Sequence, residues 1–143
     1  MAEPRLVVIG AGPIGIEAAL LGRQRGWEVT VLEAGALGEH LRRWGHVRLF
    51  TPTRMNISTR TAQQLSATGL DLDALLTGQE HIDRVLGPLA AGLDLREGHR
   101  VQSIHRHRLT RSELPGHPLR AKRPFELLVE GPRGEECLLA DGV

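Results

Sequence analysis

Residues 7–20 read VVIGAGPIGIEAAL, and this stretch decides the fold. The apolar run Arg5–Ile9 ends at a glycine, which is typical of a strand buried on both faces of a parallel sheet. Pro13–Arg25 then shows helical spacing, and Glu28–Leu32 forms a second strand pattern. Strand, tight turn, helix and strand predict a right-handed βαβ unit.

The predicted helix has one apolar face and is followed by a glycine at its C-terminal end. Its spacing places Ile14, Ala18 and Leu21 on the face that we expect to be buried, with Ala19 and Gly22 beside it. Gly26 is expected to end the helix in the left-handed conformation that glycine adopts without strain.

The turn between the first strand and the helix carries the spacing G-x-G-x-x-G. Gly10 permits the sharp turn, Gly12 lets a pyrophosphate approach the backbone, and Gly15 lets the helix pack closely on the sheet. The helix N-terminus adds free N–H groups and a partial positive charge. These features predict a dinucleotide site, and a glycine-rich turn without a ligand is the alternative.

Residues beyond the turn extend the pattern. Ala19 follows Gly15 by four positions and Gly26 follows Ala19 by seven. Glu33 ends the second strand, where a carboxylate can accept hydrogen bonds from both ribose hydroxyls and would repel a 2′-phosphate. The spacing therefore favours a dinucleotide with a free ribose.

These motifs resemble the N-terminus of FAD-dependent oxidoreductases with two dinucleotide-binding domains, a group that includes pyridine-nucleotide-dependent flavoproteins and flavin-containing monooxygenases. The resemblance implies an α/β, Rossmann-like FAD/NAD(P)-binding domain, with a parallel sheet, helices and an antiparallel β-meander. It implies FAD at the first fingerprint and NAD(P)H as a co-substrate at a second one outside this chain. The implied cofactor-binding residues in this part of the chain are Gly10, Ala11, Gly12, Pro13, Ile14, Gly15, Glu33 and Ala34.

Residues 38–52 are expected to form a loop with a short strand near Val47–Phe50. They resemble the segment beneath the flavin in bacterial monooxygenase-like flavoproteins, and this implies pocket roles for Trp44, His46, Arg48, Thr51 and Asn56.

Each of these residues also has a purely structural interpretation. Trp44 and Phe50 are typical of a core. A histidine such as His46 is often bonded to backbone, Arg48 is equally typical of a solvated surface, and Asn56 is able to cap the next helix.

Two departures from the resembling enzymes bear on chemistry. Flavin-containing monooxygenases place an asparagine after the threonine, whereas this chain has Pro52, which argues against oxygen activation. Disulfide reductases of the group carry a cysteine pair after the second strand, whereas Cys137 is the single cysteine here. The catalytic residues are not identified by the sequence.

The rest of the chain divides into a helical part and a β part. Residues of about 58–92 are predicted to be helical, with a cap at Ser58 or Thr59 and a kink or break at Pro88. A third parallel strand is expected near 93–96, and three antiparallel strands form a β-meander over about 99–141, with a loop expected at residues 109–123. The resemblance implies that the backbone at Val101 contacts adenine.

Histidines cluster in the β part of the sequence. His105 and His107 are expected to share one strand face as a surface pair, and no metal site is predicted because the sequence shows no convergent carboxylates or cysteines.

Composition narrows the class of protein. Apolar residues are 41% of the chain, which predicts a globular domain, here residues 1–143 as one FAD-binding domain expected to be incomplete. Aromatic residues are only 3% and the net charge is +1, which argues against nucleic-acid binding. No apolar run approaches the roughly 18–20 residues of a membrane span. A soluble cytoplasmic protein with a small-molecule substrate, and a homodimer as one possible assembly, are expected.

The predicted function is the FAD-binding domain of an NAD(P)H-dependent flavoprotein oxidoreductase, with a monooxygenase-like reaction as one option. An NAD-dependent dehydrogenase fragment and a non-catalytic dinucleotide-binding module are the two alternatives, because both would use the same fingerprint.

Overall fold

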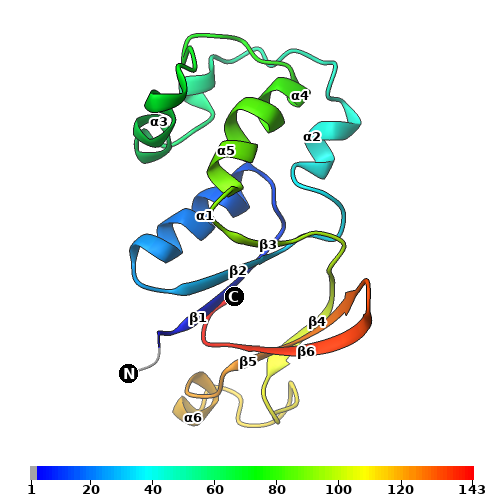
Figure 1. Ribbon diagram of the computed structural model, residues 1–143. Helices are drawn as coiled ribbons and strands as arrows, with labels where there is room; N and C mark the ends of the chain where they lie inside the picture. The colour runs from blue at the N-terminus through cyan, green and yellow to red at the C-terminus, as the bar shows by residue number, and fades with distance from the viewer. Residues whose placement is uncertain (1–2) are drawn as a thin grey trace.

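A computed structural model describes residues 3–143 and shows two three-stranded sheets packed against each other (Figure 1). The first sheet is parallel and comprises β1 (Arg5–Ile9), β2 (Glu28–Leu32) and β3 (Asp94–Arg96). The second is antiparallel and comprises β4 (Arg100–Arg106), β5 (Phe125–Gly131) and β6 (Gly134–Ala140). The predicted Rossmann-like fold with a β-meander is confirmed.

All the helices except α6 lie on the opposite side of the parallel sheet from the meander, whereas α6 lies on the outer side of the meander (Figure 1). The longest of them is α1 (Pro13–Gln24), which connects β1 to β2. The remaining helical elements are α2 (Glu39–Arg43), η1 (Thr53–Met55), α3 (Thr59–Leu65), η2 (Ser66–Thr68), α4 (Gly78–His81), η3 (Ile82–Leu86), α5 (Gly87–Ala90) and α6 (Pro118–Ala121).

Each face of the parallel sheet carries its own apolar core. Side chains alternate along a strand, so Val29 and Val31 of β2 point to the helices, whereas Leu32 points to the meander. The helix-side core includes Ile16, Leu65 and Val85 among its buried residues. The meander-side core joins Val7 and Leu32 to Leu127, Val129 and Ala140.

The buried face of α1 is rotated from the predicted one: Ile14 and Ala18 are exposed, whereas Ala19 and Gly22, predicted to lie beside that face, are buried. The helix buries Ile16, Ala19 and Gly22, whereas Ile14 is 82% exposed. The reason is that small residues set the contact, since a Cβ at Gly22 would lie 2.7 Å from the Cδ2 atom of Leu6 in β1. The large Ile14 is therefore turned away from the sheet.

In the helical region after residue 58, capping residues in the sequence mark where helices begin. The Ser58 hydroxyl accepts a hydrogen bond from the Thr61 N–H at 3.2 Å and caps α3. Thr77 and Glu80 form a reciprocal capping box at α4. The predicted disturbance at Pro88 takes the form of a π-helical turn, η3, directly before it, because proline has no N–H for the normal helical bond.

Two short helices, α2 and α6, lie where the sequence predicted loops. The prediction of a strand near Val47–Phe50 is wrong as well. That stretch forms a single antiparallel bridge, between Arg48 and Thr77. Short elements of this kind depend on tertiary contacts, since isolated helices of a few residues are not stable in water.

The residues after β6 run beside β1. Gly142 pairs with Leu6 in a parallel bridge, and its carbonyl accepts from the Val7 N–H at 3.0 Å. Asp141 adds a carboxylate bond to the Arg5 N–H at 2.8 Å. Within residues 3–143, no helix has the length and hydropathy needed to cross a membrane.

Candidate functional site

The glycine turn lies at the carboxyl end of β1, where α1 begins. Gly10 has a φ of +97°, a conformation that disfavours residues with a Cβ. Gly12 is the N-cap of α1, and a Cβ built on it would meet no atom within 4 Å. The backbone at Gly12 is thus open to a ligand from outside.

The start of α1 leaves donors free for such a ligand. The first bond of the helix joins the Ile16 N–H to the Gly12 carbonyl at 3.0 Å, and Pro13 has no N–H. The amides of Ile14 and Gly15 therefore precede the intrahelical bonding pattern and suit an anion at this position.

Gly15 has a different role from Gly12. A Cβ at Gly15 would lie 1.9 Å from the carbonyl oxygen of Gly10, well inside contact distance. The absence of a side chain here is a condition of folding, because it allows α1 to follow the turn so closely. The turn thus contains one glycine needed for packing and another that leaves open space.

Glu33 is tied to the turn by its carboxylate. Its two oxygens accept hydrogen bonds from the N–H groups of Ala11 and Gly35, each at 2.8 Å. A carboxylate offers about four lone-pair positions, so two remain for other donors such as ribose hydroxyls. The side chain is held in place before any ligand arrives.

A hollow of about 540 Å³ lies on the Glu33 side of the turn. It is lined by Glu33, Ala34, Gly35, Ala36, Glu39, His40, Arg43 and Arg100. The segment leading into β4 forms one side of it, because the N–H groups of Gly98 and His99 bond to the carbonyls of Gly35 and Glu33 at 3.0 Å and 2.8 Å. The meander and the first sheet thus meet beside the carboxylate.

A second hollow, of about 440 Å³, lies on the Pro13 side of the turn. It is lined by Pro13, Ile14, Glu17, Met55, Asn56, Ile57 and Ser58. Ile14 is 82% exposed and Met55 69% exposed, so its walls carry apolar surface. The glycine turn therefore has a polar hollow next to Glu33 and a more apolar one next to Ile14.

Of the residues predicted for the flavin side, Asn56 lines this second hollow and Thr51 contacts Asn56. The Thr51 hydroxyl donates to the Asn56 amide oxygen at 2.9 Å, and the Asn56 amide donates to the carbonyls of Thr51 and Pro52 at 3.3 Å. Asn56 thus closes a small loop and does not cap α3, which corrects the capping interpretation. Asn56 lines the hollow, whereas Thr51 supports it.

Trp44, His46 and Arg48 lie apart from the hollow. Trp44 is half-buried at the end of α2 and faces Gly78 of α4, whereas His46 is exposed. Arg48 is exposed and donates to the Leu75 carbonyl, with Glu80 at 3.9 Å.

Phe50 is 93% exposed, so the interpretation of Phe50 as a core residue is wrong. Its neighbours Arg48 and Thr51 are held by hydrogen bonds to other loop residues, so the chain is fixed here with the ring outward.

In the meander, Val101 packs partly buried against the core that covers the sheet. Val101 pairs with Val129 of β5 and lines neither hollow, so its predicted contact with adenine stays a prediction. The histidine pair differs from expectation, because Glu126 does converge on it: its carboxylate lies 2.5 Å from His107 Nδ1 and 3.7 Å from His105 Nε2. No group of three potential metal ligands was found among residues 3–143.

Sequence reasoning missed the polar lining supplied by His40, Arg43 and Arg100, and it missed Glu17. Arg43 comes from α2, a helix too short to show a pattern, and Arg100 reaches the hollow only through the pairing of 98–99 with 33–35. Glu17 carried a signal, since it is a charged residue close to the start of a helix that packs on a sheet.

The chain resembles several solved flavoprotein structures. Bacillithiol disulfide reductase Bdr (YpdA) from Bacillus cereus superposes with a TM-score of 0.71 and 15% identity, covering 98% of this chain and 38% of that one. OTEMO in complex with FAD and NADP gives 0.64 and 21%, covering 97% and 24%. Thioredoxin reductase from T. acidophilum gives 0.60 and 17%, covering 97% and 34%.

These likenesses show the fold, and the chain spans well under half the length of these three structures. No match is found among curated proteins. The family model described as pyridine nucleotide-disulphide oxidoreductase matches residues 7–85, which is more than half of the chain and includes the glycine turn and Glu33. This chain therefore belongs to the pyridine nucleotide-disulphide oxidoreductase family.

Proposed function

We propose that this chain is the FAD-binding part of an NAD(P)H-dependent flavoprotein oxidoreductase. The observation that carries the proposal is the open glycine turn with a hollow on each side. A dinucleotide is an elongated molecule with a pyrophosphate at its centre. The turn suits the pyrophosphate, and the two hollows suit the two ends.

The two ends are distinguished by chemistry. Glu33 has acceptor positions for ribose hydroxyls, and its hollow is polar, which suits the adenosine half. The hollow beside Ile14 and Met55 offers apolar surface with Asn56 at one edge, which suits an aromatic ring system with polar edges. FAD provides such a ring, and OTEMO in complex with FAD and NADP has the same fold.

In this arrangement the protein binds and orients the cofactor. When bound, FAD supplies the hydride-accepting ring, and the chemistry is that of the cofactor. The backbone at Gly12 and the amides of Ile14 and Gly15 hold the phosphates, and Glu33 holds the ribose. The apolar residues around the second hollow limit the access of water to the ring.

The whole protein's reaction is a further part of the proposal. We propose that NAD(P)H binds outside this chain and that the substrate is a small molecule, as in a soluble cytoplasmic enzyme. Thiol–disulfide exchange through a cysteine pair in this chain does not fit, because Cys137 is its single cysteine. A monooxygenase-like reaction and a homodimer remain predictions.

The proposal is tested by titrating the purified chain with FAD and with NADH, and by comparing Gly12→Val. The wild-type chain is expected to bind FAD, with a change in flavin fluorescence, more tightly than NADH. Gly12→Val is expected to abolish FAD binding because its side chain occupies the open space over the turn, while the melting temperature stays within a few degrees.

Other outcomes distinguish the alternatives. Tighter binding of NADH than FAD would favour a dehydrogenase fragment, and binding of neither would contradict the proposed cofactor site. FAD binding that survives in folded Gly12→Val would contradict the site assignment.

A further inference from the structure

Glu17 of α1 is held by the start of α3, a segment more than forty residues away in sequence. Its Oε1 atom accepts from the Ser58 N–H at 3.0 Å and from the Thr61 hydroxyl at 2.5 Å. Its Oε2 atom accepts from the Ser58 hydroxyl at 2.9 Å. Three donors thus converge on one carboxylate.

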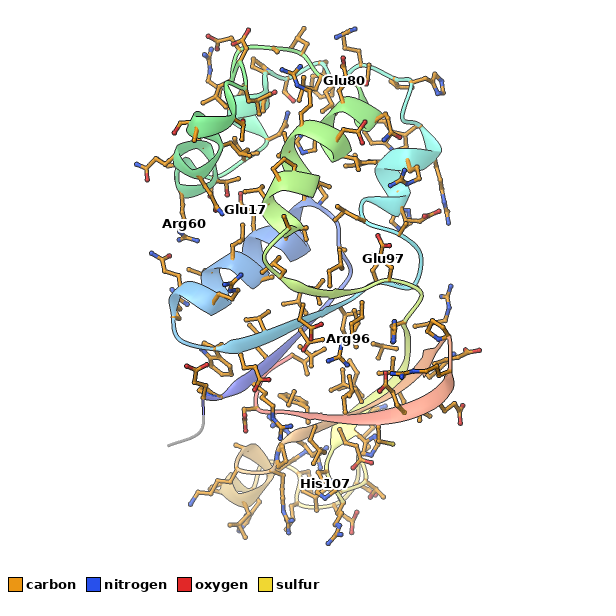
Figure 2. The ribbon with its side chains drawn as sticks, viewed as in Figure 1. Glu17, Arg60, Glu80, Arg96, Glu97 and His107 are labelled. Atoms are coloured by element: carbon orange, nitrogen blue, oxygen red, sulfur yellow. The ribbon has the colours of Figure 1, made fainter. Side chains whose placement is uncertain are left out.

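Hydrogen-bond donors and a nearby positive charge stabilise the ionised form of Glu17. Figure 2 shows Glu17 and Arg60 on the same side of the molecule, in the region where α1 and α3 face each other. Burial acts to raise the pKa of Glu17, but the bonds from Thr61 and Ser58, together with the charge of Arg60, lower it overall. The carboxylate is therefore ionised at neutral pH and accepts all three bonds.

These bonds connect two walls of the hollow beside the turn. Pro13, Ile14 and Glu17 come from α1, and Met55–Ser58 form the opposite wall. Within residues 3–143, no other hydrogen bond joins α1 to residues 50–58. The far side of that segment is fixed differently, through bonds from the N–H groups of Thr53 and Arg54 to the carbonyls of Ala74 and Leu72.

We propose that Glu17 is a positioning residue that holds the Met55–Ser58 wall at the distance from α1 required by the flavin half of the cofactor. This inference rests on the proposed function. The adenosine half binds on the other side of the turn, next to Glu33, and does not depend on this wall. Loss of the Glu17 bonds should therefore weaken the binding of FAD and spare that of ADP, which contains only the adenosine diphosphate half.

The test compares wild type, Glu17→Gln and Ser58→Ala for binding of FAD and ADP. Glutamine places an N–H₂ group against donors. Ser58→Ala removes one donor to Glu17 and the cap of α3 but keeps the backbone N–H bond to Glu17, so it is the milder variant for the carboxylate. We expect the Kd for FAD to rise at least tenfold in Glu17→Gln and about threefold in Ser58→Ala. The Kd for ADP should stay within twofold of wild type.

The matched control is Glu113→Gln. The Glu113 carboxylate also accepts a backbone N–H, that of Thr110 at 2.6 Å, but it lies in the connection between β4 and β5, away from both hollows. This variant should bind FAD and ADP as the wild type does. Hydrogen exchange supplies a readout without ligand: amides of residues 55–58 should exchange faster in Glu17→Gln, while those of the glycine turn should not change.

The outcomes separate the two proposals. If the wild type binds ADP but not FAD, the proposed function fails. If the wild type binds FAD and folded Glu17→Gln binds it equally well, the positioning role fails and the proposed function stands. An equal loss of FAD and ADP affinity would show a general structural effect and would overturn the positioning role as well.

Discussion

The two faces of the parallel sheet are covered in different ways. On the helix side, the backbone of α1 approaches the strands closely, and buried polar side chains occur at Thr53, Thr61 and His81. On the meander side, the core residues, including Leu127 and Val129, are all apolar. The open glycine turn and the exposed apolar surface of Ile14 belong to the helix side.

The two sides of the sheet therefore differ in what determines their structure. The helix side depends on backbone geometry, and a change there should alter both folding and the ligand site. The core of the meander side depends on side-chain packing, and a change within that core, away from Arg100 and the Glu33 hollow, should alter folding alone. Four substitutions test this comparison, from the largest expected effect to the smallest.

Gly15→Ala should have the largest effect. The new Cβ would overlap the Gly10 carbonyl oxygen at 1.9 Å, and a backbone atom moves less easily than the end of a side chain. We expect a loss of about 4 kcal/mol in the free energy of unfolding, measured by urea denaturation. FAD affinity of the remaining folded protein should fall at least tenfold. A stable variant with normal affinity would contradict the role of this close approach.

Leu127→Ala tests the meander side. Leu127 is completely buried, and its truncation leaves a cavity that should cost about 3 kcal/mol of stability. The Kd for FAD, measured at a temperature where the variant is folded, should stay within twofold of wild type. A large loss of affinity here would show that the two faces are not independent.

Glu33→Gln should change binding more than folding. The amide loses the charge that strengthens bonds to ribose hydroxyls, so FAD binding should weaken by about 1–3 kcal/mol in titrations. The substitution also weakens the bonds from the N–H groups of Ala11 and Gly35, and this should lower the free energy of unfolding by a smaller amount. Glu135→Gln, an exposed change at the start of β6, is the control. Unchanged affinity would remove Glu33 from the site.

His81→Leu should have the smallest effect, and one that depends on pH. His81 is 2% exposed, and its Nδ1 atom has no hydrogen-bond partner. Burial lowers its pKa below the ordinary 6.5, so the unfolded chain binds the proton more readily. Its contribution to stability is therefore present above pH 6.5 and is lost as the pH falls toward its folded-state pKa.

Melting curves at pH 8 and pH 5 measure this effect. His81→Leu should gain about 1 kcal/mol at pH 8, because an unpaired buried polar atom is removed. The gain in stability should be larger at pH 5, because the wild-type chain then has to release the His81 proton on folding or bury the charged ring. An equal gain at both pH values would contradict the pH-dependent role.

Much of the fold was predictable because its signals are local. The strands β1 and β2 have their predicted bounds, and Gly26 ends α1 with a φ of +81°. The meander also appeared in the alternation of its strands. In each case, neighbouring residues contain the information, either as a buried apolar run or as a residue that fits one backbone conformation.

The errors concern residues whose surroundings come from distant parts of the chain. Ile14 has the spacing of a buried residue but is exposed, because the contact of α1 with β1 is made through Gly15, Ala19 and Gly22. Phe50 is exposed although aromatic side chains are usually buried. Ile14 lines the hollow beside the glycine turn, where its apolar surface suits a ligand.

By itself, the sequence determined the βαβ unit, the glycine turn and the acidic residue after the second strand, because spacing along the chain is enough to place them. Only the tertiary structure decided that the turn has a hollow on each side, and that Glu17 joins α1 to the start of α3. These features arise from residues far apart in sequence, such as Glu33 with Arg100 and Glu17 with Ser58. Contacts of this kind exist only after the layers have packed, so no local pattern encodes them.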